Sequence, residues 1–269
     1  MAEEDHAYIF RLQTVQANTI KLVFEGIKEI LQDCNMIVSP TGLEILSPEQ
    51  TNTVLVHMKL SSEAFDSFYC SEPRILVGLN VQLFYSLIRN IHNNDTLSLF
   101  VLRENPTKIG IYVDNGESDR NKMTRFHLNL LHIEENNIEV PPISFSAIIK
   151  ISTTELQRTF RELNSRYDTV FVMAVNGRLI MSAENETSDT ERIIPENSNE
   201  DMVFLTKPMD GAVVQGKFSL KHLVQFTKCA NLNNTITLCL ENDKPIIIMY
   251  EAGNMGPLKF MLAQQRSGN

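Results

Sequence analysis

The chain repeats one pattern of residues after about half of its length. Residues 35–49, NMIVSPTGLEILSPE, return as residues 170–184, VFVMAVNGRLIMSAE. Residues 93–104, NNDTLSLFVLRE, return as residues 232–243, LNNTITLCLEND. The two offsets, 135 and 139 residues, are nearly equal. A repeat of this kind indicates a duplicated domain, so the 269 residues are predicted to fold as two similar halves.

Each half combines helical and strand-like segments. Apolar residues recur at helical spacing in residues 18–32, 80–92, 152–164 and 217–230. Alternating or continuous apolar residues between turn residues indicate strands at 53–60, 96–102, 108–114, 169–175, 235–241 and 245–251. In the second helical segment we expect Leu83, Phe84 and Ile88 to face inward. The pattern predicts an α+β fold: two duplicated antiparallel sheet domains, each with its helices on one face of the sheet.

Charge is distributed unevenly between these segments. The whole chain has a formal net charge of −9. The helical segments contain eight basic and four acidic residues, so they carry +4 and the rest of the chain carries −13. The basic residues are Lys21, Lys28, Arg89, Arg158, Arg161, Lys217, Lys221 and Lys228. One such residue alone would be an ordinary solvated charge, but agreement among four segments indicates a polyanionic partner on the helix side.

The two halves are joined by a segment without periodicity. Residues 130–143, LLHIEENNIEVPPI, end in two prolines, which exclude a helix. We therefore expect a first domain at 1–129, an extended interdomain connector at 130–143 and a second domain at 144–269, with 1–7 as a flexible acidic tail. The four cysteines lack metal or redox spacing, and no apolar run reaches the roughly 18 residues of a membrane helix. We expect reduced thiols, no cofactor, no metal and no membrane partner.

Four stretches resemble a known family. They are IKLVFEGIKEIL at 20–31, LSSEAFDSFYC at 60–70 with VGLNV at 77–81, the connector from Leu130 to Pro141, and NMGPLKFMLAQQ at 254–265. All four are similar to segments of the eukaryotic-type DNA sliding clamps, the proliferating cell nuclear antigen family. The similarity covers about residues 8–265, nearly the whole chain.

The resemblance implies a closed trimeric ring, with helices lining a central hole and sheets outside. It implies a non-enzymatic processivity factor that encircles double-stranded DNA without sequence preference. Such a ring tethers DNA polymerase, a clamp loader and other replication or repair proteins. A nuclear location accompanies this function, or a viral replication site if the chain is virally encoded. The alternatives are a subunit of a heterotrimeric checkpoint-type clamp and a viral clamp relative acting in transcription.

The family also implies roles for particular residues. The eight basic residues become candidates for contacts to DNA phosphates, and Ser86 departs from the pattern because it stands where the family often has a lysine. The implied groove for a partner peptide is lined by Leu55, Ile138, Val140, Pro141, Pro245, Met261, Leu262 and Ala263. Three residues depart from the usual ones there: Pro48 from methionine, Thr53 from valine and Met261 from tyrosine. Because methionine is flexible, we expect a softer pocket wall.

Subunit contacts are implied at two edge strands, about 123–129 and 190–196. Phe126, Leu128, Arg192 and Ile193 would lie in the seam, and Pro195 is predicted to shorten the second strand because it cannot donate a ladder hydrogen bond.

A metal hydrolase is the competing enzyme hypothesis. His127, His132, Glu134 and Glu135 lie within nine residues, but their spacing fits no ligand set.

Overall fold

The structure, a computed structural model, describes residues 5–115, 123–135, 138, 140, 142–197 and 201–265. The chain forms two compact units. Unit 1 comprises residues 1–47, 56–138 and 252–258, and unit 2 comprises residues 48–55, 139–251 and 259–269. The main division between the units falls inside the predicted connector. Residues 252–258 belong to unit 1 and residues 48–55 to unit 2. The predicted domains, each a continuous stretch of sequence, do not include this exchange.

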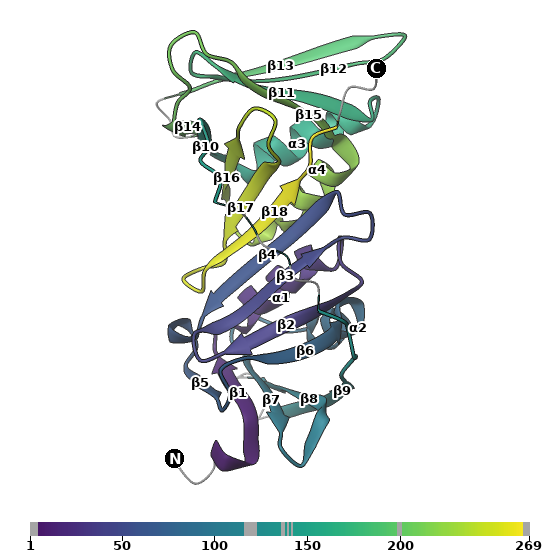
Figure 1. The fold of residues 1–269 in the computed structure, drawn as a ribbon, viewed down its shortest axis with the longest axis vertical. Helices are drawn as coiled ribbons and strands as arrows, with labels where there is room; N and C mark the ends of the chain where they lie inside the picture. The colour runs from purple at the N-terminus through teal and green to yellow at the C-terminus, as the bar shows by residue number, and fades with distance from the viewer. Residues whose placement is uncertain are drawn as a thin grey trace. The chain divides into compact units, whose positions relative to one another are not determined.

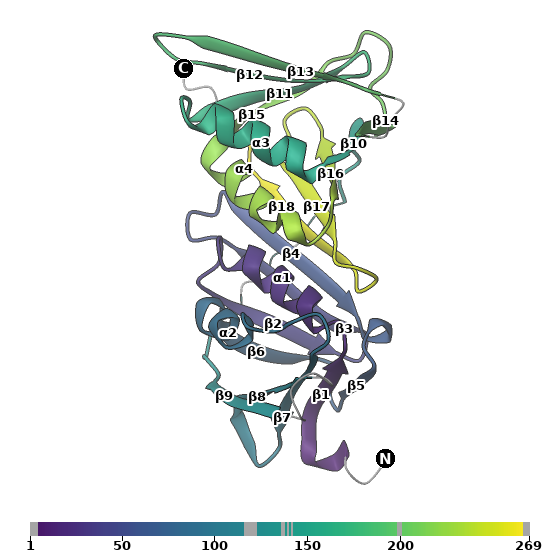
Figure 2. The ribbon, with the colours of Figure 1, turned by 180° about the vertical axis from the view of Figure 1, so that it is seen from behind.

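Unit 1 combines antiparallel strands with two helices (Figure 1). One sheet has the strand order β5-β1-β7-β8-β9, and a second group has the order β4-β3-β2-β6. The helices are α1 (Ala17–Ile27) and α2 (Val81–Ile88). The strands are β1 (Tyr8–Thr14), β2 (Asp33–Ser39), β3 (Gly42–Pro48), β4 (Val54–Ser61), β5 (Ser67–Cys70), β6 (Ile75–Asn80), β7 (Thr96–Leu102), β8 (Asn105–Asp114) and β9 (Met123–Asn129). Both helices lie on one face of the β2, β3 and β6 strands (Figure 2).

Unit 2 repeats this plan. One sheet has the order β13-β12-β11-β15, and a second group has the order β14-β10-β16-β17-β18. The helices are α3 (Thr153–Asn164), α4 (Leu220–Phe226) and a 3-10 helix, η4 (Thr227–Asn231). The strands are β10 (Ala147–Ser152), β11 (Thr169–Val175), β12 (Arg178–Glu184), β13 (Asp189–Pro195), β14 (Met202–Thr206), β15 (Val214–Ser219), β16 (Thr235–Leu240), β17 (Ile246–Glu251) and β18 (Pro257–Leu262). The predicted α+β architecture, with helices on one face, is confirmed.

Local sequence explains where several elements begin and turn. The Asn80 side chain accepts a hydrogen bond of 2.9 Å from the Leu83 N–H and so caps the first turn of α2. Asn176 and Gly177 have φ values of 48° and 70° and join β11 to β12 as a two-residue hairpin loop. Both positions need a left-handed backbone, which glycine and asparagine adopt most readily.

Aromatic side chains fill the centre of each unit. In unit 1, Phe24 of α1 packs on Phe84 of α2 with ring centroids 4.5 Å apart, and both side chains are fully buried. In unit 2, Phe226 at the end of α4 stacks on Phe260 at 5.1 Å, and the Tyr250 hydroxyl donates a hydrogen bond of 2.9 Å to the Phe226 carbonyl. Burial raises the pKa of Tyr250, so this phenol stays protonated and remains a donor. Ring packing therefore joins α1 to α2 in unit 1 and α4 to β18 in unit 2.

Several sequence expectations for these elements are wrong. Residues 214–219 form strand β15, so Lys217 lies on a strand and not on the fourth helix. The Leu83 side chain is 55% exposed, whereas Phe84 and Ile88 of the same helix are buried as expected. Within the expected flexible tail, Asp5–Ala7 form a 3-10 turn before β1.

Candidate functional site

Three of the candidate basic residues belong to the helix layer of unit 1. The Lys21 ammonium on α1 donates a hydrogen bond of 2.6 Å to the Ile91 carbonyl. Lys28 caps the C-terminus of α1, where its ammonium is 2.5 Å from Glu29 Oε1 and 4.9 Å from the centre of the Tyr85 ring. Arg89 is the C-cap of α2 and is exposed. A positive charge at a helix C-terminus interacts favourably with the helix dipole. Lys28 and Arg89 therefore also stabilise their helices, apart from any contact to a partner.

The remaining basic residues belong to unit 2. Arg158 and Arg161 are exposed on α3, Lys221 is exposed on α4, and Lys228 is exposed on η4. Lys217 is separate from them, because it projects from β15 with its ammonium 5.2 Å from the centre of the Phe171 ring. The helix layer of unit 2 thus presents four exposed cations, and Lys217 is not part of it.

One carboxylate reduces the positive charge of this layer. Glu155 on α3 receives the Arg158 guanidinium at 2.6 Å on Oε2 and the Arg192 guanidinium at 2.8 Å on Oε1. Arg192 is on β13, so the carboxylate links a helix to a strand of the neighbouring sheet. Arg158 is therefore a weaker candidate for anion contact than Arg161, which forms no ion pair with any described residue.

An apolar cluster in unit 2 contains part of the expected partner groove. Cys239, Ile247 and Met261 are each 8–9% exposed, and the half-buried side chains Leu55, Phe145 and Ile148 pack against them. Leu55 and Met261 were expected there; the other four were missed, although they lie on or beside strands β10, β16 and β17. Burial raises the pKa of the Cys239 thiol to about 11, so it acts here as a small apolar group.

The other groove candidates are placed differently. Leu262 is only 2% exposed and faces the interior, so its side chain does not line a surface. The Ala263 N–H donates a hydrogen bond of 2.9 Å to the Thr53 carbonyl. Pro245 and Ile138 are half-buried and Val140 is 36% exposed. Pro141 lies outside the described residues.

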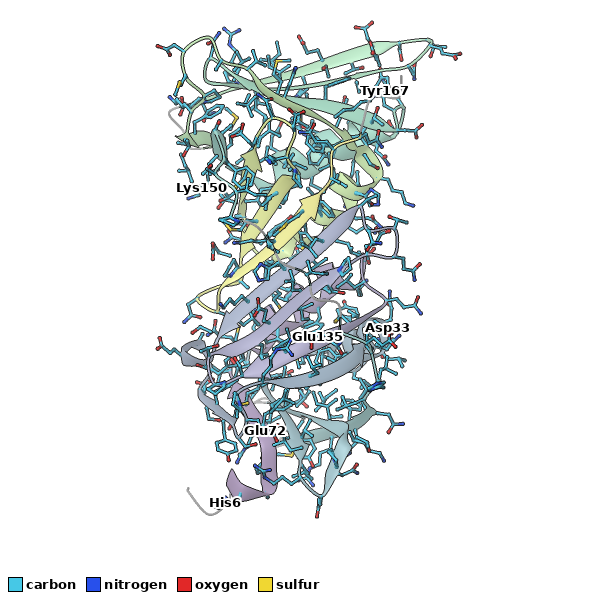
Figure 3. All side chains as sticks on the ribbon, viewed as in Figure 1. His6, Asp33, Glu72, Glu135, Lys150 and Tyr167 are labelled. Atoms are coloured by element: carbon cyan, nitrogen blue, oxygen red, sulfur yellow. The ribbon has the colours of Figure 1, made fainter. Side chains whose placement is uncertain are left out.

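The first half of the connector is fixed to unit 1. The Leu131 N–H donates a hydrogen bond of 2.9 Å to the Gly78 carbonyl of β6, and the Asn35 side chain donates one of 3.1 Å to the Ile133 carbonyl. The Arg74 guanidinium binds both carboxylate oxygens of Glu135, which is labelled in Figure 3. The connector thereby covers the edge strand β6.

The two strands expected at subunit contacts each lie at one end of a sheet. β9 is the last strand of the β5-β1-β7-β8-β9 sheet in unit 1, and β13 is the last strand of the β13-β12-β11-β15 sheet in unit 2. Phe126 and Leu128 on β9 are half-buried, and Ile193 on β13 is 47% exposed. Pro195 is the final residue of β13, which keeps all seven residues, so the predicted shortening does not occur. Edge strands of this length are suited to strand addition from another chain.

Two of the residues of the metal-hydrolase hypothesis, His127 and Glu135, contact other protein groups. His127 lies on β9 with its ring 6.0 Å from that of Tyr112, and Glu135 is engaged by Arg74. Among the described residues, no group of three histidine, cysteine or carboxylate side chains is arranged to hold a metal. Within the same part of the chain, no helix is long and apolar enough to cross a membrane.

Sequence families match both halves of the chain. The family described as "Proliferating cell nuclear antigen, N-terminal domain" matches residues 9–137, and "Proliferating cell nuclear antigen, C-terminal domain" matches residues 139–265. The probable DNA polymerase sliding clamp 1 of Paramecium bursaria Chlorella virus 1 is 29% identical over 264 residues, which are 97% of this chain and 98% of that protein. The proliferating cell nuclear antigen of Chaetomium thermophilum is 26% identical, covering 92% and 95% of the two chains.

A solved structure has the same fold. The crystal structure of the proliferating cellular nuclear antigen from Entamoeba histolytica aligns with a TM-score of 0.85 at 22% identity. The alignment covers 96% of this chain and all of the other. Both units therefore have the fold of their counterparts in that protein.

Proposed function

This chain belongs to the proliferating cell nuclear antigen family, and we propose that it acts as a sliding clamp built from three identical subunits. The clamp encircles duplex DNA and tethers DNA polymerase and other replication and repair proteins, and it catalyses no reaction itself. The observation that carries this proposal is the match of family domains to 9–137 and 139–265, together with the position of β9 and β13 at the ends of their sheets. We also propose the domain limits 1–129 and 144–269, with residues 130–143 as the connector.

We propose that β9 of one subunit pairs with β13 of the next. The two strands differ in sequence and belong to different units of one chain, so their contact is head-to-tail and closes into a ring when each subunit is rotated by 120°. Ile193 and Phe126 supply apolar area at the seam, with Leu128 beside Phe126 and Arg192 beside Ile193. Arg192 already contacts Glu155, so its side chain is held in place before a partner arrives.

We propose that the helix layer faces the DNA. The exposed cations Arg89, Arg161, Lys221 and Lys228 are the best placed to meet phosphates. Lys21 and Lys28 on α1 are further candidates in unit 1, each already in contact with a protein oxygen. Arg158 contributes less because it is paired to Glu155. Lys217 is excluded from this set by its place on β15. Weak, nonspecific phosphate contacts suit a ring that is retained by topology and slides along the duplex.

We propose that the apolar cluster of Leu55, Phe145, Ile247 and Met261 receives the apolar anchor of a partner peptide. Ile138, Val140 and Pro245 complete the groove in this proposal, as the family resemblance implies. The relatives are a viral clamp and a fungal one, so we propose the nucleus or a viral replication site as the location.

Molar mass and polymerase assays test this function. Light scattering of the purified chain across a dilution series should give a mass three times that of the 30.6 kDa chain. Addition of the ring, with a clamp loader, should lengthen the products of a DNA polymerase on long primed template. A monomer that trimerises only with other chains would instead indicate a heterotrimeric checkpoint-type clamp. A homotrimer without effect on synthesis would indicate a clamp relative that acts in transcription.

A further inference from the structure

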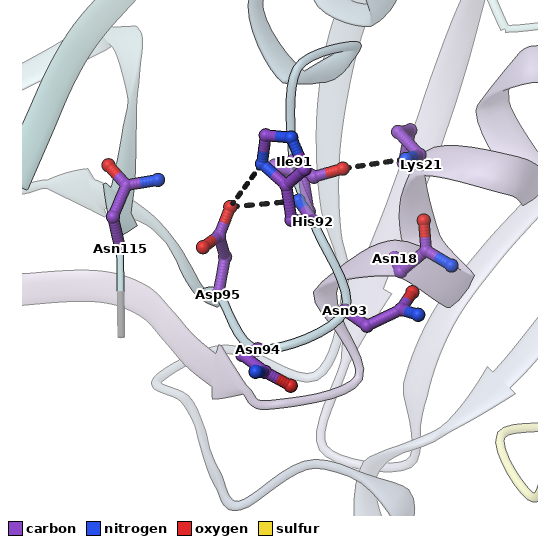
Figure 4. Close-up of a pocket in the computed structure, with 8 residues that line it drawn as sticks. All are labelled: Asn18, Lys21, Ile91, His92, Asn93, Asn94, Asp95 and Asn115. Atoms are coloured by element: carbon purple, nitrogen blue, oxygen red, sulfur yellow. Dashed lines mark hydrogen bonds and ion pairs between the residues drawn. The ribbon is translucent and has the colours of Figure 1, made fainter. Parts of the chain in front are cut away.

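Unit 1 has a polar pocket beside the N-terminal end of α1. The pocket encloses about 560 Å³ and is lined by Asn18, Lys21, Ile91, His92, Asn93, Asn94, Asp95 and Asn115 (Figure 4). We call it the asparagine pocket, because four of these eight residues are asparagines. Ile91 to Asp95 form the loop between α2 and β7, and Asn18 and Lys21 come from α1. With Asn115, which follows β8, three segments far apart in the sequence meet around this cavity.

Most polar groups of the pocket are available to a ligand. Within the described residues, the side-chain amides of Asn18, Asn93 and Asn94 form no hydrogen bond. The Lys21 ammonium donates one hydrogen bond, to the Ile91 carbonyl, and an ammonium has three donors. Lys21 therefore holds the loop in place and keeps two N–H groups for another acceptor. The pocket is therefore rich in donors that no group of the described residues uses.

The carboxylate of Asp95 lines the pocket but is nearly buried and is engaged by its own loop. Asp95 is 4% exposed, and its Oδ2 accepts a hydrogen bond of 2.8 Å from the His92 N–H and lies 3.6 Å from His92 Nδ1 (Figure 4). This carboxylate fixes the turn of the loop from inside. The other polar groups that line the cavity are amides, the Lys21 ammonium and the exposed His92 ring.

The pocket lies on the same stripe of α1 as Lys28. Residues 18, 21, 25 and 28 follow one another at spacings of three and four, so they share a helix face. Ten residues separate Asn18 from Lys28, which is about 15 Å along the helix. If Lys28 faces the duplex, the pocket faces it too, at a distance of about 15 Å along the helix.

We propose that the asparagine pocket binds a phosphodiester group of the encircled duplex, mainly through neutral amide donors. This inference rests on the proposed clamp function. Amide donors hold a phosphate oxygen without displacing a counterion, so they add affinity that does not depend on salt. Because α2 itself carries no basic residue and only its C-cap, Arg89, is a cation, such a contact adds affinity where the layer has little charge. The shared ligand chemistry is a phosphate oxygen, from duplex DNA or from a free phosphate.

The test measures duplex affinity across a salt series with the intact trimeric ring. The double variant Asn93→Ala/Asn94→Ala should bind a short labelled duplex about two- to tenfold more weakly at every salt concentration, with an unchanged slope of log K against log salt. Both side chains are exposed and unbonded within the described chain, so the variant should keep its trimer mass and melting temperature. Asn90→Ala is the matched control, since Asn90 is exposed nearby but does not line the pocket. It should bind as the original chain does.

A charge variant separates failure of this inference from failure of the clamp function. Lys28→Ala should make the slope of log K against log salt shallower by about 0.9 for each phosphate that the ring no longer neutralises. If Lys28→Ala has this effect and Asn93→Ala/Asn94→Ala binds normally, the inference is wrong and the clamp function stands. A shallower slope in the asparagine variant would also overturn it, because the contact would then be ionic. If neither variant changes binding, the DNA-facing assignment itself fails.

A second measurement distinguishes the two sources of phosphate. In spectra of isotope-labelled ring, the side-chain amide signals of Asn18, Asn93 and Asn94 should shift when duplex is added. Inorganic phosphate at matched ionic strength should leave them in place. Equal shifts with inorganic phosphate alone would assign the pocket to a free anion and overturn the proposal.

Discussion

The substitution Gly78→Ala should separate the connector from unit 1. A Cβ atom at Gly78 would lie 2.1 Å from the Leu131 carbonyl oxygen and 2.9 Å from its carbon. Both obstacles are backbone atoms, so no side-chain rotation can relieve the clash. β6 is held to β2 by pairs from Asp33↔Asn80 to Val38↔Ile75, whereas the connector is held at only a few points. We therefore expect the connector to move and β6 to stay.

The size of the effect follows from these contacts. An ordinary contact distance of 3.4 Å requires the Leu131 carbonyl to withdraw by about 1.3 Å. That movement breaks the 2.9 Å hydrogen bond from Leu131 to Gly78, which contributes about 0.5–1.5 kcal/mol. Where the connector cannot move far enough, the remaining overlap of the new Cβ atom with the Leu131 backbone destabilises the fold by about 1–3 kcal/mol more. Since the Leu131 side chain is already 40% exposed, we expect the lower part of the summed range, a total loss of about 1.5–3 kcal/mol.

Two measurements check this reasoning. Hydrogen exchange should show reduced protection of the Leu131 amide in Gly78→Ala, and denaturant unfolding at fixed protein concentration should give the free-energy change. Arg74→Gln is the control, because it removes the link to Glu135 and leaves the Leu131 hydrogen bond in place. It should raise exchange near residue 135 only. A protected Leu131 amide in Gly78→Ala, with stability unchanged, would refute the argument.

Three further predictions concern charge, the groove and pH. The double reversal Lys28→Glu/Lys228→Glu should shorten polymerase products and flatten the salt dependence of DNA retention while the trimer persists; unchanged retention would contradict the DNA-facing assignment. Met261→Ala should weaken binding of a labelled clamp-binding peptide about tenfold or more, since it removes a wall of the apolar cluster, whereas Met209→Ala, at an 87% exposed side chain outside the cluster, should not. Hydrogen bonding to Arg74 lowers the pKa of Glu135, so this link is complete above the unfolded carboxyl pKa of about 4.3 and is lost as pH falls through the lower folded value. Exchange protection near residue 135 should therefore decline only below about pH 4, and a decline at neutral pH would disprove the cause.

Much of the fold could be predicted because the period of apolar residues is clear. The predicted bounds 96–102 and 169–175 coincide with β7 and β11, where apolar residues alternate or run together between turns. The fourth helix was placed too early because the period changes within one segment. Val214, Gly216 and Phe218 are buried at strand spacing, and helical spacing begins only at Leu220. Leu83 was wrongly placed inside, since the short helix α2 buries only a narrow stripe.

The candidate site could be predicted less completely. Leu55 and Met261 followed from the family pattern, but Phe145, Ile148, Cys239 and Ile247 did not. Their strands have the apolar pattern of any buried strand. The sequence does not indicate which of these apolar side chains lie near a surface. The asparagine pocket was missed for a different reason. A run such as HNND indicates a turn, and only the fold brings it to Asn18 and Lys21.

The carboxylate of Glu155 has a consequence for DNA contact. It holds the guanidinium of Arg158 on the helix and that of Arg192 on β13 at the same time. If a DNA phosphate draws Arg158 away from Glu155, Arg192 still neutralises that carboxylate. In the proposed DNA-facing arrangement, Arg192 would therefore lower the cost of moving Arg158 from Glu155 to a phosphate, so that even this paired residue could contact the backbone reversibly.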